Sequence, residues 1–303
     1  MKKFLFPVFI FQILSITSSA CDICGCGVSN YNPYMFPHLA GTFIGLGYEH
    51  RHFHTHFLDQ GEEISNDESY NSIMLAAQFS PLKRLRILAL VPFQLNNQAG
   101  PEGNKSLSQF GDISLLFNYT ILDQKSKNKR LRQSLLLGAG CKIPTGAFAF
   151  DENSESGVGN SNFQPGTGST DLLLNSYYSI RYGNLAFSTA LHYRINSENE
   201  DGYRFGNRLQ SISQLKMIVE IGDVSFIPNL GIMMETAGQD REFGTKIIEN
   251  RTGGNITNAI CGLDINTRNL AIGFNYATVI AQNLAAGQIV EQPGFSIRMG
   301  YTF

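Results

Sequence analysis

The amino-acid sequence predicts an all-β protein, a transmembrane antiparallel up-and-down β-barrel of about 12 strands. Three features lead to this prediction: apolar and polar residues alternate, the last strand ends in an aromatic residue, and short connections alternate with long ones. Alternation is informative because successive side chains of a strand point to opposite faces. In a membrane barrel the apolar face contacts lipid and the polar face lines the interior.

The alternation is clearest between residues 185 and 196. One face of this stretch would hold the odd-numbered residues, which are Leu185, Phe187, Thr189, Leu191, Tyr193 and Ile195. Residues 113–121 and 270–277 follow the same pattern. A soluble β-sandwich with one wet face would alternate in the same way, so the other two features decide between these folds.

The C-terminal strand has a pattern typical of outer-membrane barrels. Its apolar face would hold Phe295, Ile297, Met299, Tyr301 and the terminal Phe303. An aromatic terminal residue on an alternating strand resembles the signal that such barrels present to the outer-membrane barrel assembly machinery. The sequence therefore predicts this machinery and the lipid bilayer as partners.

The spacing of the connections also indicates a barrel. Strands are predicted to start near residues 41, 70, 84, 110, 131, 168, 184, 204, 223, 253, 270 and 292. Tight connections fall at 81–83, 183–184, 222–223 and 266–269, with a longer one at 123–130; long polar connections fall at 57–69, 96–109, 145–167, 197–203, 238–252 and 282–291. Short periplasmic turns alternating with long external loops are the signature of barrels in the Gram-negative outer membrane. Both chain ends are then expected in the periplasm.

The N-terminus divides the chain into three parts. Residues 1–20 are predicted to form a cleaved signal peptide, because Lys2 and Lys3 precede an apolar run at 4–16 and small residues follow. That apolar run is shorter than the roughly 20 residues that a spanning helix needs. Residues 21–40 would be a Cys-rich segment, either periplasmic or a plug, and residues 41–303 the outer-membrane barrel.

Three segments in the middle of the chain carry a family resemblance. They are GDISL at 111–115, LGAGCKIPTG at 137–146 and PGTGSTD at 165–171. Their order and spacing resemble the outer-membrane proteins grouped as the "MetA-pathway of phenol degradation" family, over residues 110–220. The resemblance implies a barrel that passes small molecules across the outer membrane. Without the family, the Pro144-Thr145-Gly146 sequence already predicts the end of a strand and the start of the longest loop.

A cluster of cysteines follows the predicted cleavage site. Cys21, Cys24 and Cys26 lie within six residues in a glycine-containing segment, where three thiolates could bind a soft metal such as Cu or Zn. Two alternatives stay open. The cysteines could form a disulfide in an oxidising compartment, or Cys21 could carry a lipid.

Four of the six histidines alternate along one predicted strand. His50, His52, His54 and His56 would share a face, with neighbours roughly 6.5–7 Å apart. They are candidate metal ligands; the alternative is an exposed strand tip whose imidazoles titrate near pH 6.5. The four histidines are at even-numbered positions, as is Ile44, which is predicted to face lipid. They are therefore predicted to face outward, near the external loop. They would lie far from the cysteines unless residues 21–40 run up through the lumen.

In each predicted strand, the polar set of alternating side chains is predicted to line the lumen. The charged and histidine candidates are Glu49, Arg51, Lys142, Arg181, His192, Arg194, Lys216 and Arg298. Their mixed charges indicate ion pairs across the interior and not a strongly ion-selective pore. Cys141 and Cys261 have the opposite parity and are predicted to be packing thiols on the lipid face.

The composition narrows the function. A formal net charge of −2 gives no support for binding nucleic acid, and we find no nucleophile–base pair, phosphate loop or metalloprotease motif, so an enzyme is not predicted. The leading hypothesis is a transporter or channel for a small solute, with Cu or Zn handling as an option and no cofactor otherwise expected. The alternatives are a metal-binding or sensing surface protein anchored by the barrel, and a barrel enzyme. An open lumen would favour transport, whereas a lumen packed shut would favour the binding protein.

Overall fold

The computed structural model describes most of the predicted barrel. The described residues are 41–59, 62–100, 103–125, 130–148, 163–243, 246–247 and 252–303. The predicted signal peptide and the segment with Cys21, Cys24 and Cys26 lie outside these ranges. No helix among the described residues is long and apolar enough to cross a membrane.

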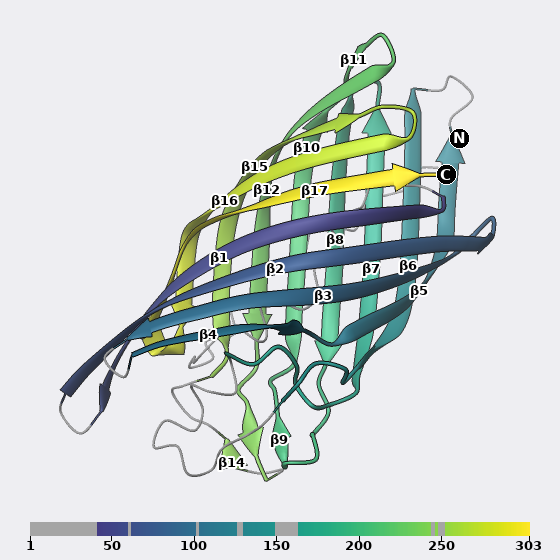
Figure 1. Ribbon diagram of the computed structural model, residues 1–303. Coiled ribbons are helices and arrows are strands. Elements are labelled where there is room, and N and C mark those ends of the chain that lie inside the picture. Colours follow the sequence, from purple (N-terminus) through teal and green to yellow (C-terminus); the bar gives the residue numbers. More distant parts are fainter. Residues whose placement is uncertain are drawn as a thin grey trace, which may run out of the picture.

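Long strands make up nearly all of the described chain (Figure 1). Those of the barrel wall are β1 (Phe43–Asp59), β2 (Glu62–Leu82), β3 (Leu85–Gly100), β5 (Ile113–Lys125), β6 (Leu131–Ile143), β7 (Asp171–Tyr182), β8 (Leu185–Ile195), β10 (Arg208–Met217), β12 (Val224–Ala237), β15 (Gly254–Asn266), β16 (Leu270–Leu284) and β17 (Ile289–Thr302). The shorter elements are β4 (Gly103–Phe110), β9 (Tyr203–Arg204), β11 (Val219–Ile221), β13 (Arg241–Glu242), β14 (Lys246–Ile247) and the 3-10 helix η3 (Ala285–Gly287).

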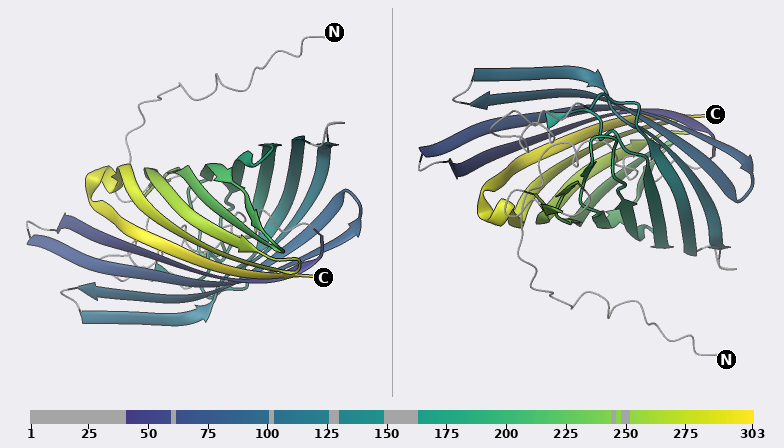
Figure 2. Two further views of the ribbon diagram at one scale, coloured as in Figure 1. Left: turned by 90° about the horizontal axis from the view of Figure 1, so that it is seen from above. Right: turned by 90° about the horizontal axis from the view of Figure 1, so that it is seen from below.

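The sheet closes on itself. It contains 14 strands, of which β4 is an extension beside β3 and β11 a short strand beside β12. The other 12 strands form a ring of antiparallel neighbours, closed where β1 pairs with β17 and β10 pairs with β12. Figure 1 shows β17 beside β1, where the first and last strands meet, and Figure 2 shows the same sheet from above and from below. The predicted 12-stranded up-and-down barrel is therefore confirmed.

The wall is apolar outside and polar inside. Ile44 and Leu46 on β1 are about half exposed, as are Phe274 and Tyr276 on β16. The alternate positions point inward, and inward Gln94 on β3 is fully buried. Since exposed apolar residues ring the outside of the sheet, the surface is suited to contact with lipid chains.

Some of the predicted long connections are wrong. β1 and β2 stay paired as far as Asp59 and Glu62, so 57–69 is mainly strand, and β3 and β4 form a hairpin over 96–109. β16 and β17 are separated by only a short turn around η3. The strand residues at 62–69 and 96–98 are nearly all polar, so their composition resembles that of a loop. The strand expected from residue 204 begins at Arg208.

Two prolines lie where the backbone ladder changes partner. β3 pairs with β5 as far as Leu90 and with β4 from Phe93, and Pro92 lies between these stretches. On β12, Pro228 lies between the stretch paired with β11 and the stretch paired with β10. Proline has no N–H to donate, so it is tolerated at a break in the ladder.

Candidate functional site

The inner face of the barrel carries many buried polar side chains. On the neighbouring strands β8 and β10, His192, Arg194, Gln210 and Gln214 are all buried and point inward. Burying a charge costs several kcal/mol unless it is paired and hydrogen-bonded. The interior is therefore expected to contain matched charges, and the following contacts match them.

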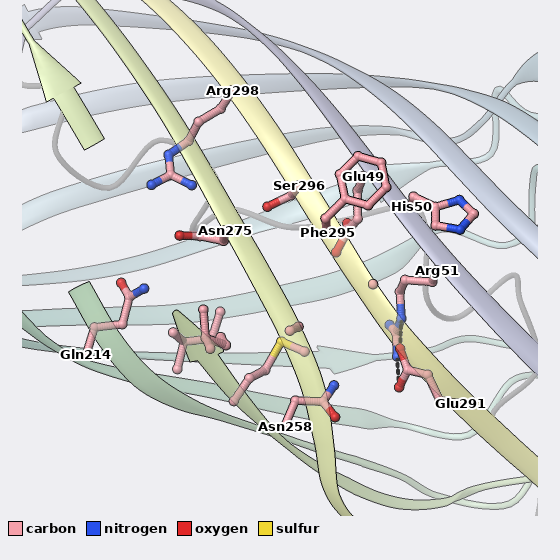
Figure 3. A pocket seen from close by; sticks show the side chains of 15 residues that line it. Glu49, His50, Arg51, Gln214, Asn258, Asn275, Glu291, Phe295, Ser296 and Arg298 are labelled. Carbon is pink, nitrogen blue, oxygen red and sulfur yellow. Dashed lines mark hydrogen bonds and ion pairs between the residues drawn. The ribbon is translucent and has the colours of Figure 1, made fainter. Parts of the chain in front are cut away.

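Arg51 on β1 is the centre of the first network. Its guanidinium donates to both carboxylate oxygens of Glu291 on β17, from Nε to Oε1 at 2.6 Å and from Nη2 to Oε2 at 2.9 Å (Figure 3). Its Nη1 lies 3.5 Å from Oε2 of Glu235 on β12. Arg208 on β10 donates to Oε1 of Glu235 at 2.8 Å. Two arginines face two glutamates, so this network carries no net charge.

A second ion pair lies nearer the short-turn end of the barrel. Arg298 on β17 donates through Nη2 to Oδ1 of Asp264 on β15. Gly273 on β16 pairs with both residues in the ladder, and a Cβ at this position would collide with both side chains. A glycine here gives the ion pair the room it needs. Lys216 on β10 is buried on the same inner face.

A small cavity lies between these two ion-pair groups. Its volume is about 60 Å³, and Glu49, Gln214, Asn258, Asn275 and Ser296 line it together with Arg51, Glu291 and Arg298 (Figure 3). Its apolar side is formed by Ile212, Met233 and Ile260, which pack as one cluster. The space holds at most a few water molecules. The cavity lies among the inward side chains of β1, β10, β12, β15, β16 and β17.

Larger apolar clusters also point inward. One contains Phe43, Met74, Ala76, Leu88, Leu90, Leu116 and Leu173. Another contains Phe53, Tyr70, Ile256, Leu284, Ala285 and Ile289, with Phe163 packed against it. A water-filled pore is normally lined by polar groups, so these clusters make the interior amphipathic.

The three segments that carry the family resemblance meet in one buried cluster, the Asp112–Lys142–Asp171 cluster. Nζ of Lys142 on β6 lies 2.6 Å from Oδ2 of Asp112, which precedes β5, and 2.9 Å from Oδ2 of Asp171 on β7. All three side chains are fully buried. The cluster joins one segment from each of three neighbouring strand ends.

Backbone groups complete the Asp112–Lys142–Asp171 cluster. The N–H groups of Gly146 and Thr167 each donate to Asp112 at 3.0 Å, to Oδ1 and Oδ2 respectively. Gly146 and Gly166 approach so closely that a Cβ on Gly166 would clash with the Gly146 carbonyl. The glycines of these segments therefore allow two loop backbones to touch.

The predicted lumen residues are placed as follows. Arg51, Lys142, His192, Arg194, Lys216 and Arg298 are buried on the inward face, and Glu49 lines the cavity. Arg181 instead lies at the short-turn rim, where Nη2 is 3.6 Å from Oε1 of exposed Glu220 and Nε donates to the Gly183 carbonyl. Arg181 is the second-last residue of β7. The alternation of side chains gives the face of a residue but does not distinguish the rim from the lumen.

Sequence reasoning missed most of the partner carboxylates. Asp112, Asp171, Asp264 and Glu291 were not among the predicted residues, yet each pairs with a predicted cation. Their inward parity was a usable signal, because an acidic residue at a buried strand position requires a partner.

The four alternating histidines do face outward, away from the charged interior. Nδ1 of His54 lies 2.8 Å from Oδ1 of Asp67 on β2, and Nε2 of His52 lies 3.6 Å from the same oxygen. Nδ1 of His50 contacts Oδ1 of Asn71 at 2.8 Å, and the rings of His54 and His56 pack edge to face. Within the described residues no group of three or more metal-ligating side chains is ready to hold an ion. The histidines thus form no preassembled metal centre.

The cysteines are divided between described and undescribed parts. Cys141 and Cys261 are free thiols on the outward face, half-buried and exposed respectively. The predicted metal ligands Cys21, Cys24 and Cys26 lie outside the described residues.

The loops at the long-loop end hold a buried carboxylate. Asp240, which follows β12, accepts hydrogen bonds from the Tyr203 hydroxyl to Oδ2 and the Gly206 N–H to Oδ1, both at 2.6 Å. Its own N–H donates to Thr252 at 2.8 Å. Burial raises the pKa of Asp240 to about 6, although these hydrogen bonds act to lower it.

The raised pKa of Asp240 predicts that the free energy of unfolding depends on pH. Because its pKa is higher in the folded than in the unfolded protein, the folded state holds the proton more tightly, and stability falls as pH rises from about 4 through about 6. Asp240→Asn keeps a neutral side chain, so the variant should gain about 2–3 kcal/mol over the wild type between pH 4 and pH 8. Urea unfolding of both proteins across that range tests this, and two parallel curves would refute it.

Comparison with known proteins gives one family match and two similar structures. A family model matches residues 60–219, more than half of the chain. An outer-membrane channel from Pseudomonas putida F1 is similar in structure, with a TM-score of 0.61 and 13% identity over 91% of this chain and 98% of that one. The NanC porin matches with a TM-score of 0.43 and 10% identity over 87% of this chain and all of that one. No curated protein sequence matches.

The family match and the likeness to the Pseudomonas putida channel agree with the geometry. The structural likeness at 13% identity supports the fold, and the apolar outer wall places the barrel in the lipid bilayer of the cell outer membrane. The family match covers all three segments that meet in the Asp112–Lys142–Asp171 cluster. The chain is therefore an outer-membrane β-barrel belonging to the family described as "Putative MetA-pathway of phenol degradation".

Proposed function

We propose that the protein is a passive outer-membrane channel for small solutes that are uncharged and partly apolar. One observation carries the proposal: the Arg51–Glu291–Glu235–Arg208 network and the Arg298–Asp264 pair of the inner face are each neutral, and apolar clusters lie beside them. A lining of paired charges gives little selectivity between anions and cations. Inward apolar side chains lower the cost of taking an apolar group out of water. The family description, which mentions phenol degradation, is consistent with small phenols as solutes.

Uptake by whole cells tests this proposal. Porin-deficient Gram-negative cells producing the folded barrel should take up the apolar dye N-phenyl-1-naphthylamine faster than cells with an empty vector. In planar bilayers the purified protein should show small currents with little ion selectivity. If uptake equals that of the vector control although the barrel is present in the outer membrane, the proposal is wrong.

A second candidate function is cation binding on the outer surface. We propose that His52, His54 and Asp67 bind a divalent ion such as Zn²⁺ by a small rearrangement. Support comes from the two imidazole nitrogens, which lie 3.6 and 2.8 Å from one carboxylate oxygen. Ligand atoms around a tetrahedral Zn²⁺ lie roughly 3.3 Å apart, because each bond is about 2.0–2.1 Å long. A cavity of about 320 Å³ adjoins His52 and Asp67 and leaves room for bound water.

Calorimetry with ZnCl₂ distinguishes Zn²⁺ binding at this site from Zn²⁺ binding by the cysteines. The titration uses a background in which Cys21, Cys24 and Cys26 are serine, and compares it with the same protein carrying His52→Ala and His54→Ala. The background should bind one Zn²⁺ that the double variant loses, while His50→Ala leaves binding unchanged. Equal binding by the background and the double variant would exclude these ligands.

A further inference from the structure

A short segment lies inside the barrel at its long-loop end. Residues 163–170 precede β7, and Pro165, Gly166, Thr167 and Ser169 within them are buried. A connecting segment normally runs over the surface, so its burial needs specific contacts.

One end of the segment is held by the Asp112–Lys142–Asp171 cluster. The Thr167 N–H and Oγ1 both donate to Oδ2 of Asp112, at 3.0 and 3.1 Å, and Nζ of Lys142 donates to Oγ1 of Thr167. The Ser169 hydroxyl donates to Oδ1 of Asp171 at 2.8 Å. These contacts fix the segment next to β5, β6 and β7.

The other end is held at a different part of the wall. Phe163 packs against the cluster formed by Phe53, Tyr70, Ile256, Leu284, Ala285 and Ile289, which come from β1, β2, β15, β16, η3 and β17. The Phe163 carbonyl accepts a hydrogen bond at 3.0 Å from Nδ2 of Asn96, which is buried on β3. In the ring, β16 lies six strands from β6 in either direction. The segment thus contacts the wall from β5–β7 at one end to the apolar cluster on β1, β2 and β15–β17 at the other, and its Phe163 carbonyl also reaches β3, which lies between these strands in the ring.

From these contacts we infer that residues 163–170 cross the interior as a constriction that sets the size limit of the barrel. The inference rests on the proposed channel function. The Asp112–Lys142–Asp171 cluster holds one end, and Phe163 with Asn96 holds the other. The two anchors Phe163 and Thr167 are four residues apart, a stretch that spans at most about 14 Å when extended, and the side chains of Phe163, Asn96, Asp112 and Lys142 reach from the wall to meet it. The family segments are then the fixed support of this constriction.

The experiment releases the Phe163 end and leaves the ion cluster intact. The variant carries Asn96→Ala and Phe163→Ala; the matched control carries Asn97→Ala and Phe243→Ala, which change a neighbouring outward amide and an exposed loop ring. Heat-modifiable migration on gels checks that all proteins fold. Proteinase K cleavage mapped by mass spectrometry reports the position of the segment, and planar-bilayer conductance with uncharged polymers of graded size reports the size limit.

The two readouts separate this inference from the channel proposal. We expect new cuts within residues 163–170 and a conductance at least about two-fold higher in the variant, with the control like the wild type. New cuts without current in any protein would support the crossing segment and refute the channel. Absence of new cuts, or new cuts with an unchanged size limit in a conducting protein, would overturn the constriction.

Discussion

Replacing Lys142 with methionine is expected to lower the free energy of unfolding by about 3–5 kcal/mol. The side chain is fully buried and its Nζ lies within 2.9 Å of carboxylate oxygens of both Asp112 and Asp171. Without the ammonium group, two buried negative charges would face each other. The N–H groups of Gly146 and Thr167 still donate to Asp112, so the effect should fall toward the lower end of this range.

A neutral version of the cluster is the control for this prediction. The triple variant with Asp112→Asn, Lys142→Met and Asp171→Asn keeps similar shapes but has no buried charge, so it should recover most of the lost stability. Because the chain has no tryptophan, unfolding in urea is followed by circular dichroism of the protein in lipid vesicles. A Lys142→Met variant within 1 kcal/mol of the wild type would show that the ion cluster contributes little.

The barrel could be predicted because apolar and polar residues alternate regularly along its strands. Each outward position meets lipid and each inward position meets other side chains, so the period of two in residues 185–196 directly encodes the two faces of β8. The same rule placed His50 and His54 on the outer surface and Arg298 inside. Strand ends were harder to predict, since residues 62–69 at the start of β2, EEISNDES, are nearly all polar and have the composition of a loop.

The partners inside the barrel could not be predicted by periodicity. Arg51 and Glu291 are separated by 240 residues, and they meet because the first and last strands pair when the ring closes. Parity gives the face of a residue but not its height or its neighbours across the lumen. Arg181 has inward parity yet lies at the rim for the same reason.

The glycine-rich segments were interpreted as turns, which is part of their role. The sequence did not reveal that Gly146 and Gly166 touch each other, or that Asp112 and Asp171 flank Lys142. Their contacts join loops at three strand ends, so no single segment contains the signal. A charged residue beside such glycines is a usable clue, because backbone N–H groups left free by close approach need an acceptor.

Replacing Arg51 with methionine is the second change with a large expected effect. The guanidinium makes two hydrogen bonds to Glu291 and lies 3.5 Å from Glu235, and all three side chains are buried. Its loss leaves the Glu291 carboxylate without this cation, so the free energy of unfolding should fall by about 3–5 kcal/mol. Arg51→Lys keeps the charge but loses the two-pronged geometry, so its effect should be smaller.

The double variant Arg51→Met with Glu291→Met tests what the network is for. Removing both partners leaves Glu235 paired with Arg208, so stability should return to within about 1–2 kcal/mol of the wild type or rise above it. If the stability of the double variant does return to this level, the Arg51–Glu291 pair beside the cavity is not needed to stabilise the fold. A changed solute preference in this stable double variant would then assign the network to the solute path, whereas unchanged uptake together with full stability would remove Arg51 from that path.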